Sequence, residues 1–264
     1  PEFSVAPLQW CFPVIGCVSY RGYFKEEKAQ HFAGELDADG YDTMVGGVPA
    51  YSTLGRFSDP VLNTMLQFPD TRFAGIVFHE LAHQKLYIKD DTAFNEAFAT
   101  AVQEEGVRRW LAATAPEPDD ALLAYGIERE RVQLFAALVR STRDELEAMY
   151  ALDLPDDEKR ARKAGIFEQL KERYGALKAD SFGGYDAWFD RPLNNADLAA
   201  VATYHELLPG FEALLADSSG DLELFYANAE ALGAQEPEIR RKTLKQLSES
   251  YVLGEEFEKS GVGE

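Results

Sequence analysis

The segment His79-Glu80-Leu81-Ala82-His83 constrains the fold of this chain more than any other part of it. Residues four apart share one face of an α-helix, so a helix brings both imidazoles to one side, where they can bind one metal ion. Glu80 directly follows His79 in the sequence, so its carboxylate would lie next to such an ion without being one of its ligands. Apolar residues flank the motif and indicate burial. The sequence therefore predicts a helix over 71–87, capped by Asp70, that carries a metal site.

A catalytic zinc ion takes three protein ligands and keeps one position open. Glu96 is the candidate third ligand, because it lies 13 residues after His83 and one turn into the next predicted helix, which begins at Asp91 or Thr92. In such a site Glu80 is the general base for a metal-activated water. Alternatively, Glu96 is a first-turn glutamate stabilised by the helix dipole. The residues that follow Glu96 are small and allow two helices to approach closely: Ala97, Ala99, Thr100 and Ala101.

Four other acidic residues lie near Glu96 in the sequence. Asp90 and Asp91 are better interpreted as helix caps in the connecting loop. Glu104 and Glu105 lie two to three turns along the second helix, and we expect them on its exposed face. Glu96 is therefore the preferred ligand.

Composition and charge exclude several classes of protein. The 264 residues are 46% hydrophobic and 27% charged, which is ordinary for one or two folded domains. The net charge of −20 disfavours binding to nucleic acid and to anionic lipid. No apolar run is long enough to span a membrane. The chain begins at Pro1 without a methionine, so we expect a processed or truncated form, and a membrane anchor would have to lie before it.

The distribution of residue patterns predicts an α+β fold in a single domain, 1–264. Residues 1–69 are richer in strand signals and are expected to form a small mixed sheet with one helix. Residues 70–264 are mainly helical, and 119–177 is expected to be a long helical hairpin. Val14–Tyr20 carries a strand or hairpin signal, and Lys25–Leu36 is expected to be an amphipathic helix. Tyr41–Val45 and Val48–Leu54 are expected to be short extended pieces, and Pro49 makes the second an edge strand or a non-strand.

The end of the chain carries three shorter helical patterns. The first runs from Asn195 or Asp197 to Leu208, where Pro209-Gly210 is expected to break it. Two more follow at 221–232 and 237–251. Residues 181–195 are rich in Gly, Asn and aromatic residues and are expected to form a packed loop.

The chain resembles the putative aminopeptidase family, bacterial gluzincin-like proteins with an HExxH zinc site. The resemblance rests on Val77–His83, Phe94–Val102, Trp10–Pro13, Arg21–Phe24, Gly46–Gly55, Asn194-Asn195 and Tyr204-His205. It implies a zincin-like helical body, one zinc ion and a hydrolase, an aminopeptidase-like metallopeptidase, that acts on peptides. Well-studied gluzincins have a longer connection before the third ligand than the 12 residues between His83 and Glu96, so the resemblance implies an abbreviated connection here.

The two cysteines, Cys11 and Cys17, are six positions apart. Their spacing fits two buried thiols in a reducing compartment as well as a small disulfide loop in an oxidising one. Members of the family often carry a bacterial signal or lipoprotein leader. The resemblance therefore implies the bacterial periplasm or cell envelope, rather than the cytoplasm, and favours the disulfide.

Other site residues are placed by analogy with gluzincins. There an edge strand about 30 residues before HExxH holds an extended substrate. The residues at that place here are Gly47, Val48, Pro49, Ala50 and Tyr51, which alternatively form a Gly-Gly turn and a proline-stiffened loop. Tyr204 and His205 are candidates to donate a hydrogen bond to the developing oxyanion, or else a core tyrosine and a surface histidine. Asn95 is a candidate to orient a zinc-bound imidazole through its far ring nitrogen.

Two functions of other classes stay open. The first is an envelope protein stabilised by zinc without catalysis; Glu80 argues against it, because a structural site does not need that carboxylate. The second is a zinc-free interaction domain that uses the hairpin at 119–177. For a peptidase, the sequence assigns no anchor for a free N-terminus, so exopeptidase versus endopeptidase activity stays open.

Overall fold

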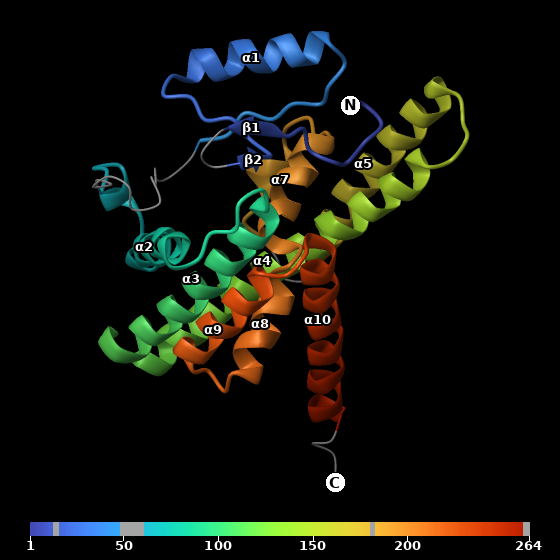
Figure 1. The fold of residues 1–264 in the computed structure, drawn as a ribbon. Helices are drawn as coiled ribbons and strands as arrows, with labels where there is room; N and C mark the ends of the chain where they lie inside the picture. The colour runs from blue at the N-terminus through green and yellow to red at the C-terminus, as the bar shows by residue number, and fades with distance from the viewer. Residues whose placement is uncertain (13–15, 48–60, 180–182, 261–264) are drawn as a thin grey trace. The chain divides into compact units, whose positions relative to one another are not determined.

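The chain is mostly helical, with one small antiparallel sheet near its N-terminus (Figure 1). The computed structural model describes residues 1–12, 16–47, 61–179 and 183–260. They fall into two compact units. The first unit comprises 1–10, 19–47 and 120–202, and the second comprises 11–18, 48–119 and 203–264. The predicted border at position 69, between a strand-rich and a helical part, does not separate these units, because each contains residues from both sides of it. The organisation as a single domain stays a prediction.

The sheet is smaller than the sequence predicts. Within the described residues it has two strands, β1 (Trp10–Phe12) and β2 (Gly16–Val18). The expected extended piece Tyr41–Val45 does not join this sheet, and the main-chain oxygen of Thr43 accepts a hydrogen bond from Asn194 Nδ2 at 2.8 Å. The expected extended piece Val48–Leu54 lies outside the described residues. The expected mixed sheet is thus an antiparallel pair of short strands.

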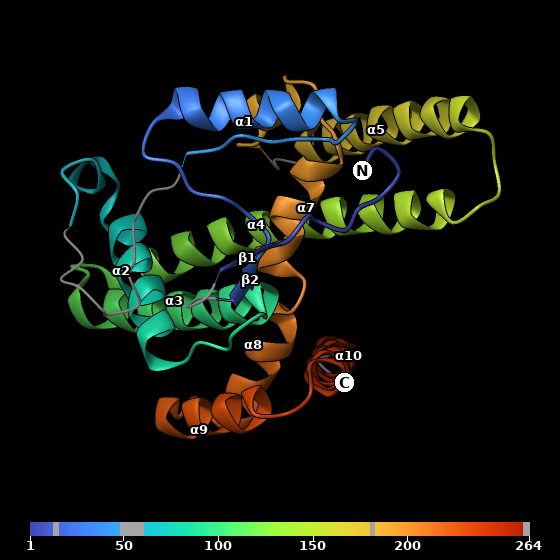
Figure 2. The ribbon, with the colours of Figure 1, turned by 45° about the horizontal axis from the view of Figure 1, so that its top comes forward.

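The first unit is built around a helical hairpin. Figure 2 shows α4 (Pro118–Tyr150) and α5 (Asp156–Ala179) side by side and antiparallel, as the pattern at 119–177 predicts. Arg173 on α5 makes hydrogen bonds of 2.7 and 3.2 Å to the carboxylate of Glu145 on α4. The unit also holds α1 (Glu26–Ala38), α6 (Asp186–Phe189) and most of α7 (Asn195–His205). Its core includes Phe135, Leu138, Val139, Leu146, Phe167, Leu170, Tyr174 and Leu198.

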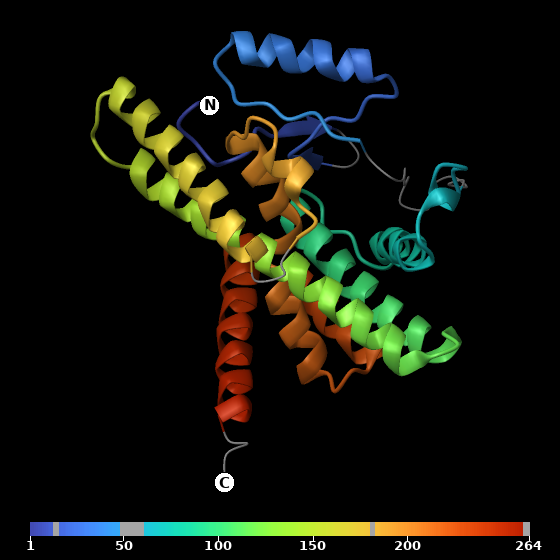
Figure 3. The same cartoon turned by 180° about the vertical axis from the view of Figure 1, so that it is seen from behind.

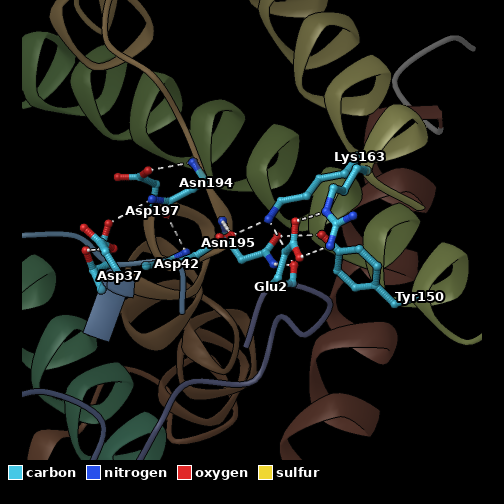
Figure 4. A network of polar contacts seen from close by, with 11 residues as sticks. Glu2, Asp37, Asp42, Tyr150, Lys163, Asn194, Asn195 and Asp197 are labelled. Atoms are coloured by element: carbon cyan, nitrogen blue, oxygen red, sulfur yellow. Dashed lines mark hydrogen bonds and ion pairs between the residues drawn. The ribbon is translucent and has the colours of Figure 1, made fainter. Parts of the chain in front are cut away.

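A polar network ties the start of the chain to this unit (Figure 4). The main-chain oxygen of Glu2 accepts hydrogen bonds from Lys163 Nζ at 3.0 Å and from Asn195 Nδ2 at 2.9 Å. One oxygen of Asp42 accepts from the same Lys163 Nζ at 2.6 Å and from the main-chain nitrogen of Asn195 at 2.9 Å. The hydroxyl of Tyr150 donates to Asn195 Oδ1 at 2.9 Å. Asn194-Asn195 therefore joins the first residues, the segment after α1 and the hairpin.

The second unit contains the predicted metal-binding helices. It comprises η1 (Met65–Gln67), α2 (Asp70–Lys85), α3 (Thr92–Thr114), α8 (Leu208–Asp217), α9 (Leu222–Gly233) and α10 (Pro237–Ser260). α2 packs along α3, α3 packs on α8, and α8 contacts both α9 and α10. The contact between α8 and α10 is also visible from behind, in orange and red (Figure 3). Aromatic side chains fill the core of this unit, among them Phe94, Phe98, Phe211 and Phe225.

Pro209-Gly210 begins a helix instead of ending one. The chain turns between His205 and Leu208, and α8 then starts with Pro209 in its first turn, where the missing N–H of proline is not needed. Gly210 is required because α8 and α10 approach closely there: a Cβ at this position would lie 2.4 Å from the main-chain oxygen of Leu244. The sequence analysis does not predict the helix at 208–217, because it interprets Pro209-Gly210 as the end of a helix.

The two predicted caps differ in outcome. Asp91 caps α3, as predicted, because its Oδ1 accepts a hydrogen bond from the main-chain nitrogen of Phe94 at 3.2 Å. The prediction for α2 is wrong by one residue. Pro69 occupies the cap position, and Asp70 is the first helical residue and makes no capping hydrogen bond. Its charge still lies at the positive end of the helix dipole.

Among the described residues, no helix has both the length and the apolar character needed to cross a membrane.

Candidate metal centre

The HExxH segment lies within α2, so the two histidines project from one face of the helix. Their ring centroids are 4.8 Å apart and the rings are nearly perpendicular, with an interplanar angle of 85°. His83 is buried and His79 is half-buried. The imidazoles are thus adjacent without being stacked, as two ligands of one ion must be.

Glu96 faces both histidines from the first turn and a half of α3. Its Oε2 lies 3.1 Å from Nε2 of His79 and 3.7 Å from Nε2 of His83. One ligand atom from each of the three residues lies within 4.8 Å of the others, so the group could hold a metal ion. The predicted ligands therefore come together on two neighbouring helices.

The charge of Glu96 depends on these contacts. Burial by itself raises the pKa of the carboxyl, but hydrogen bonds from His79 and His83, and their positive charge when protonated, outweigh it and lower the pKa to about 2. The carboxylate is therefore ionised at neutral pH. An ionised carboxylate with two imidazole nitrogens is a donor set typical of catalytic zinc sites.

The close approach of α2 and α3 follows from small residues on both helices. The small residues after Glu96 are buried: Ala97, Ala99, Thr100 and Ala101. Gly106 of α3 lies against the ring of Phe78, where a Cβ would come within 2.7 Å of the ring. Phe78 directly precedes His79, so this contact sets how closely the HExxH helix lies on its partner.

Gln103 is a contact of the site that the sequence prediction missed. Its Oε1 lies 3.2 Å from Nδ1 of His79, the ring nitrogen that points away from Glu96. The sequence held one signal for it, since Gln103 follows Glu96 by seven residues, which is two helical turns on the same face.

The side chain of Asn95 does not take the role that the sequence suggested. Its Oδ1 accepts a hydrogen bond from the main-chain nitrogen of Ile88, and its Nδ2 donates to the main-chain oxygen of Ile88, both at 2.7 Å. Asn95 is also almost fully buried. It therefore fixes the short loop between α2 and α3, and through that loop the position of the neighbouring Glu96.

Two tyrosines border the imidazole pair. The ring of Tyr204, near the end of α7, lies 6.4 Å from that of His79 at an angle of 37°. The ring of Tyr87 lies 6.4 Å from that of His83. Burial, and then the negative charges of Glu96 and Asp90, raise the pKa of the Tyr87 phenol. His205 follows Tyr204 as the last residue of α7 and is half-buried.

Glu80 is half-buried on α2, next to His79. Of the candidate substrate strand, Gly47 is exposed, and Val48, Pro49, Ala50 and Tyr51 lie outside the described residues.

Glu104 and Glu105 are buried, so the expectation that they lie on the exposed face of α3 is wrong. Glu105 is satisfied by its own helix, because Arg108 and Arg109 each approach its carboxylate at 2.7 Å. Burial raises the pKa of Glu105, but these hydrogen bonds and charges lower it overall.

Cys11 and Cys17 are joined by a disulfide, which links β1 and β2. The main-chain nitrogen of Cys17 donates a hydrogen bond to Oδ1 of Asp90 at 2.5 Å. Asp90 belongs to the loop between α2 and α3, so the disulfide-linked strands contact the connection between the helices that carry His79, His83 and Glu96.

Comparison with known proteins identifies the family. The sequence model of the family described as "Putative aminopeptidase" matches residues 1–244, which include parts of both units. A comparison with curated proteins found no match, and neither did a comparison with solved structures. The family indicates a peptidase with a peptide substrate. With a match over most of its length, the chain belongs to the putative aminopeptidase family.

Proposed function

We propose that this protein is a zinc-dependent peptidase of the gluzincin type that uses His79, His83 and Glu96 as ligands and Glu80 as general base. The observation that carries the proposal is the position of Glu96, one oxygen of which faces Nε2 of both HExxH histidines at 3.1 and 3.7 Å. The residues fit zinc, because two neutral imidazoles and one carboxylate leave a fourth position open for a reactant.

When bound, zinc would polarise the scissile carbonyl and make a neighbouring water more acidic. The carboxylate of Glu80, one residue from His79 and half-buried, would take a proton from the attacking water. The same carboxylate would then return the proton to the nitrogen of the leaving amine. Glu80 thus serves two proton transfers, which is why a site of this type needs a carboxylate that is not a ligand.

We further propose Tyr204, with His205 beside it, as the donor to the negative charge that develops on the carbonyl oxygen. Tyr204 is 41% exposed and its ring centroid lies 6.4 Å from that of His79, so its side chain borders the proposed metal site. The segment Gly47–Tyr51 is proposed to hold the substrate backbone in extended form. Among these groups, Tyr204 has the most direct structural support.

The proposal includes aminopeptidase activity and a location in the bacterial periplasm or cell envelope. The description of the family supports the first. The Cys11–Cys17 disulfide supports the second, because disulfides persist in oxidising compartments.

A metal assay combined with a peptide-library cleavage screen tests the proposal. Wild-type protein should bind one zinc ion and cleave peptides, and Glu80→Gln should keep the zinc and lose turnover. Glu249→Gln, which changes an exposed glutamate on α10, is the matched control and should behave as wild type. Zinc binding without cleavage by the wild type would favour a structural zinc protein. Equal cleavage by wild type and Glu80→Gln would remove Glu80 from the mechanism.

Comparison of free and N-acetylated peptides separates the two kinds of peptidase. An aminopeptidase should cleave only peptides with a free N-terminus, whereas cleavage of both forms would show an endopeptidase.

A further inference from the structure

We infer that Gln103 is a positioning residue, which holds His79 in the tautomer and orientation that leave its Nε2 atom available to the metal. The inference rests on the proposed zinc function. It starts from the two sides of the His79 ring: Nε2 lies 3.1 Å from Glu96 Oε2, and Nδ1 lies 3.2 Å from Gln103 Oε1. Both ring nitrogens therefore have partners, and the partners lie on the same helix, α3.

The chemistry of the amide oxygen determines the tautomer. A neutral imidazole carries a proton on one nitrogen and a lone pair on the other. The amide oxygen of Gln103 can only accept a hydrogen bond, so Nδ1 must be the nitrogen that carries the proton. When a metal ion binds at Nε2, that nitrogen supplies its lone pair, and Nδ1 keeps the proton that Gln103 Oε1 accepts. A ligand histidine generally makes this kind of hydrogen bond through its far nitrogen, which fixes the ring orientation.

The second observation is the room that α2 makes for Gln103. Gly75 lies one turn before His79 and is buried. A Cβ at Gly75 would lie 3.4 Å from Cγ of Gln103 and 3.5 Å from its Nε2. The Gln103 side chain thus lies directly across the backbone of α2, and a larger side chain at position 75 would displace it. A Cβ alone would fit at this position, whereas the two further methyl groups of a valine would press on the Gln103 side chain.

Gln103 contacts His79 but gives no such hydrogen bond to His83. Nδ1 of His83 is buried, and within the described part of the chain it has no hydrogen-bond partner. Loss of Gln103 would therefore affect the orientation of His79 and leave His83 as it is. Because an amide is neutral, Gln103 orients the ring without adding negative charge; a carboxylate there would make the imidazole a stronger electron donor.

Measurement of zinc affinity by competition with a chelator tests the inference without relying on activity. Gln103→Leu should bind zinc about 10–100-fold more weakly than wild type, the usual effect of losing such a partner. Gln103→Glu keeps an oxygen acceptor and should bind at least as tightly as wild type. Gln246→Leu, the same exchange at an exposed position on α10, is the control and should leave the affinity unchanged.

Nitrogen-15 NMR of the histidine side chains shows which ring nitrogen of His79 carries a proton and how fast that proton exchanges. A purely structural role of Gln103 would leave both unchanged. In the zinc-loaded wild type and Gln103→Glu, His79 should carry its proton on Nδ1, and exchange of this proton with water should be slow. In Gln103→Leu the exchange should become fast. If Gln103→Leu does not fold, Gly75→Val, which displaces Gln103 and keeps both histidines, should show the same loss of zinc affinity.

The outcomes separate this inference from the proposed function. Zinc binding by the wild type together with equal affinity in Gln103→Leu, or in Gly75→Val if only that variant folds, would overturn the inference alone. No zinc binding by the wild type would overturn the proposed function and the inference with it.

Discussion

The guanidinium of Arg240 donates two hydrogen bonds to Oδ2 of Asp91, at 2.8 and 3.1 Å, and both side chains are buried. The other oxygen of Asp91 caps α3. Arg240 lies on α10, and its remaining nitrogen donates to the main-chain oxygens of Gly233 and Gln235. The C-terminal helix is thereby bonded to the first turn of the helix that carries Glu96.

This ion pair should be a major contributor to the stability of the second unit. Arg240→Ala leaves the carboxylate of Asp91 buried without its counter-charge, and removal of one partner from a buried pair costs about 3–5 kcal/mol. Chemical denaturation of the metal-free protein measures the change. Arg241→Ala, at the next and exposed position, should have little effect. Equal stability of the two variants would show that the pair does not hold α10 to α3.

Two glycine-to-alanine exchanges should have opposite effects on stability, because Gly210 lies in the tight contact between α8 and α10 and Gly165 has free space around it. Gly210→Ala forces a Cβ to 2.4 Å from the main-chain oxygen of Leu244 and should destabilise the protein by about 1–3 kcal/mol. Gly165→Ala, in α5, meets no heavy atom within 4 Å and should stabilise it by about 0.5–1 kcal/mol. Thermal unfolding of both variants checks the signs. Stabilisation by Gly210→Ala would contradict the close approach.

Stability at high pH should depend on Tyr150. Burial raises the pKa of its hydroxyl to about 12. Because the folded-state pKa lies above the ordinary value of 10.0, the contribution is complete below pH 10 and is lost as the pH rises toward 12. Denaturation at several pH values should show this loss in wild type and a smaller loss in Tyr150→Phe. Identical pH profiles would show that Tyr150 does not contribute.

The parts of the site that the sequence predicts are those determined by local periodicity. His79 and His83 are four residues apart, and a helix alone places them together. Glu96 required one further step, a short loop that folds the next helix back, which small residues in α3 made plausible. Asn95 is a candidate partner of the imidazoles from the sequence, which does not fix the pairing. Its side chain instead bonds to Ile88, and the acceptor for His79 comes from two turns further along α3.

The differences between the predicted and the observed structure have both tertiary and local causes. Pro209-Gly210 has the composition of a helix break, yet the proline lies in the first turn of α8, and the glycine makes room for α10. Glu105 appeared to be a surface acid, but two arginines of its own helix satisfy it in a buried position. The expected extended segment 41–45 bonds to Asn194 instead of joining the sheet. The local sequence does not identify Leu244 or Asn194 as partners, whereas the spacing of Arg108 and Arg109 from Glu105 can be seen in it.

X-ray diffraction from zinc-soaked crystals, recorded on both sides of the zinc absorption edge, tests the central claim most directly. We predict one anomalous peak at about 2.0–2.2 Å from Nε2 of His79, Nε2 of His83 and a carboxylate oxygen of Glu96. In Glu96→Ala the peak should be lost or much weaker. A zinc peak elsewhere in the wild-type protein, with none between these three side chains, would contradict the account.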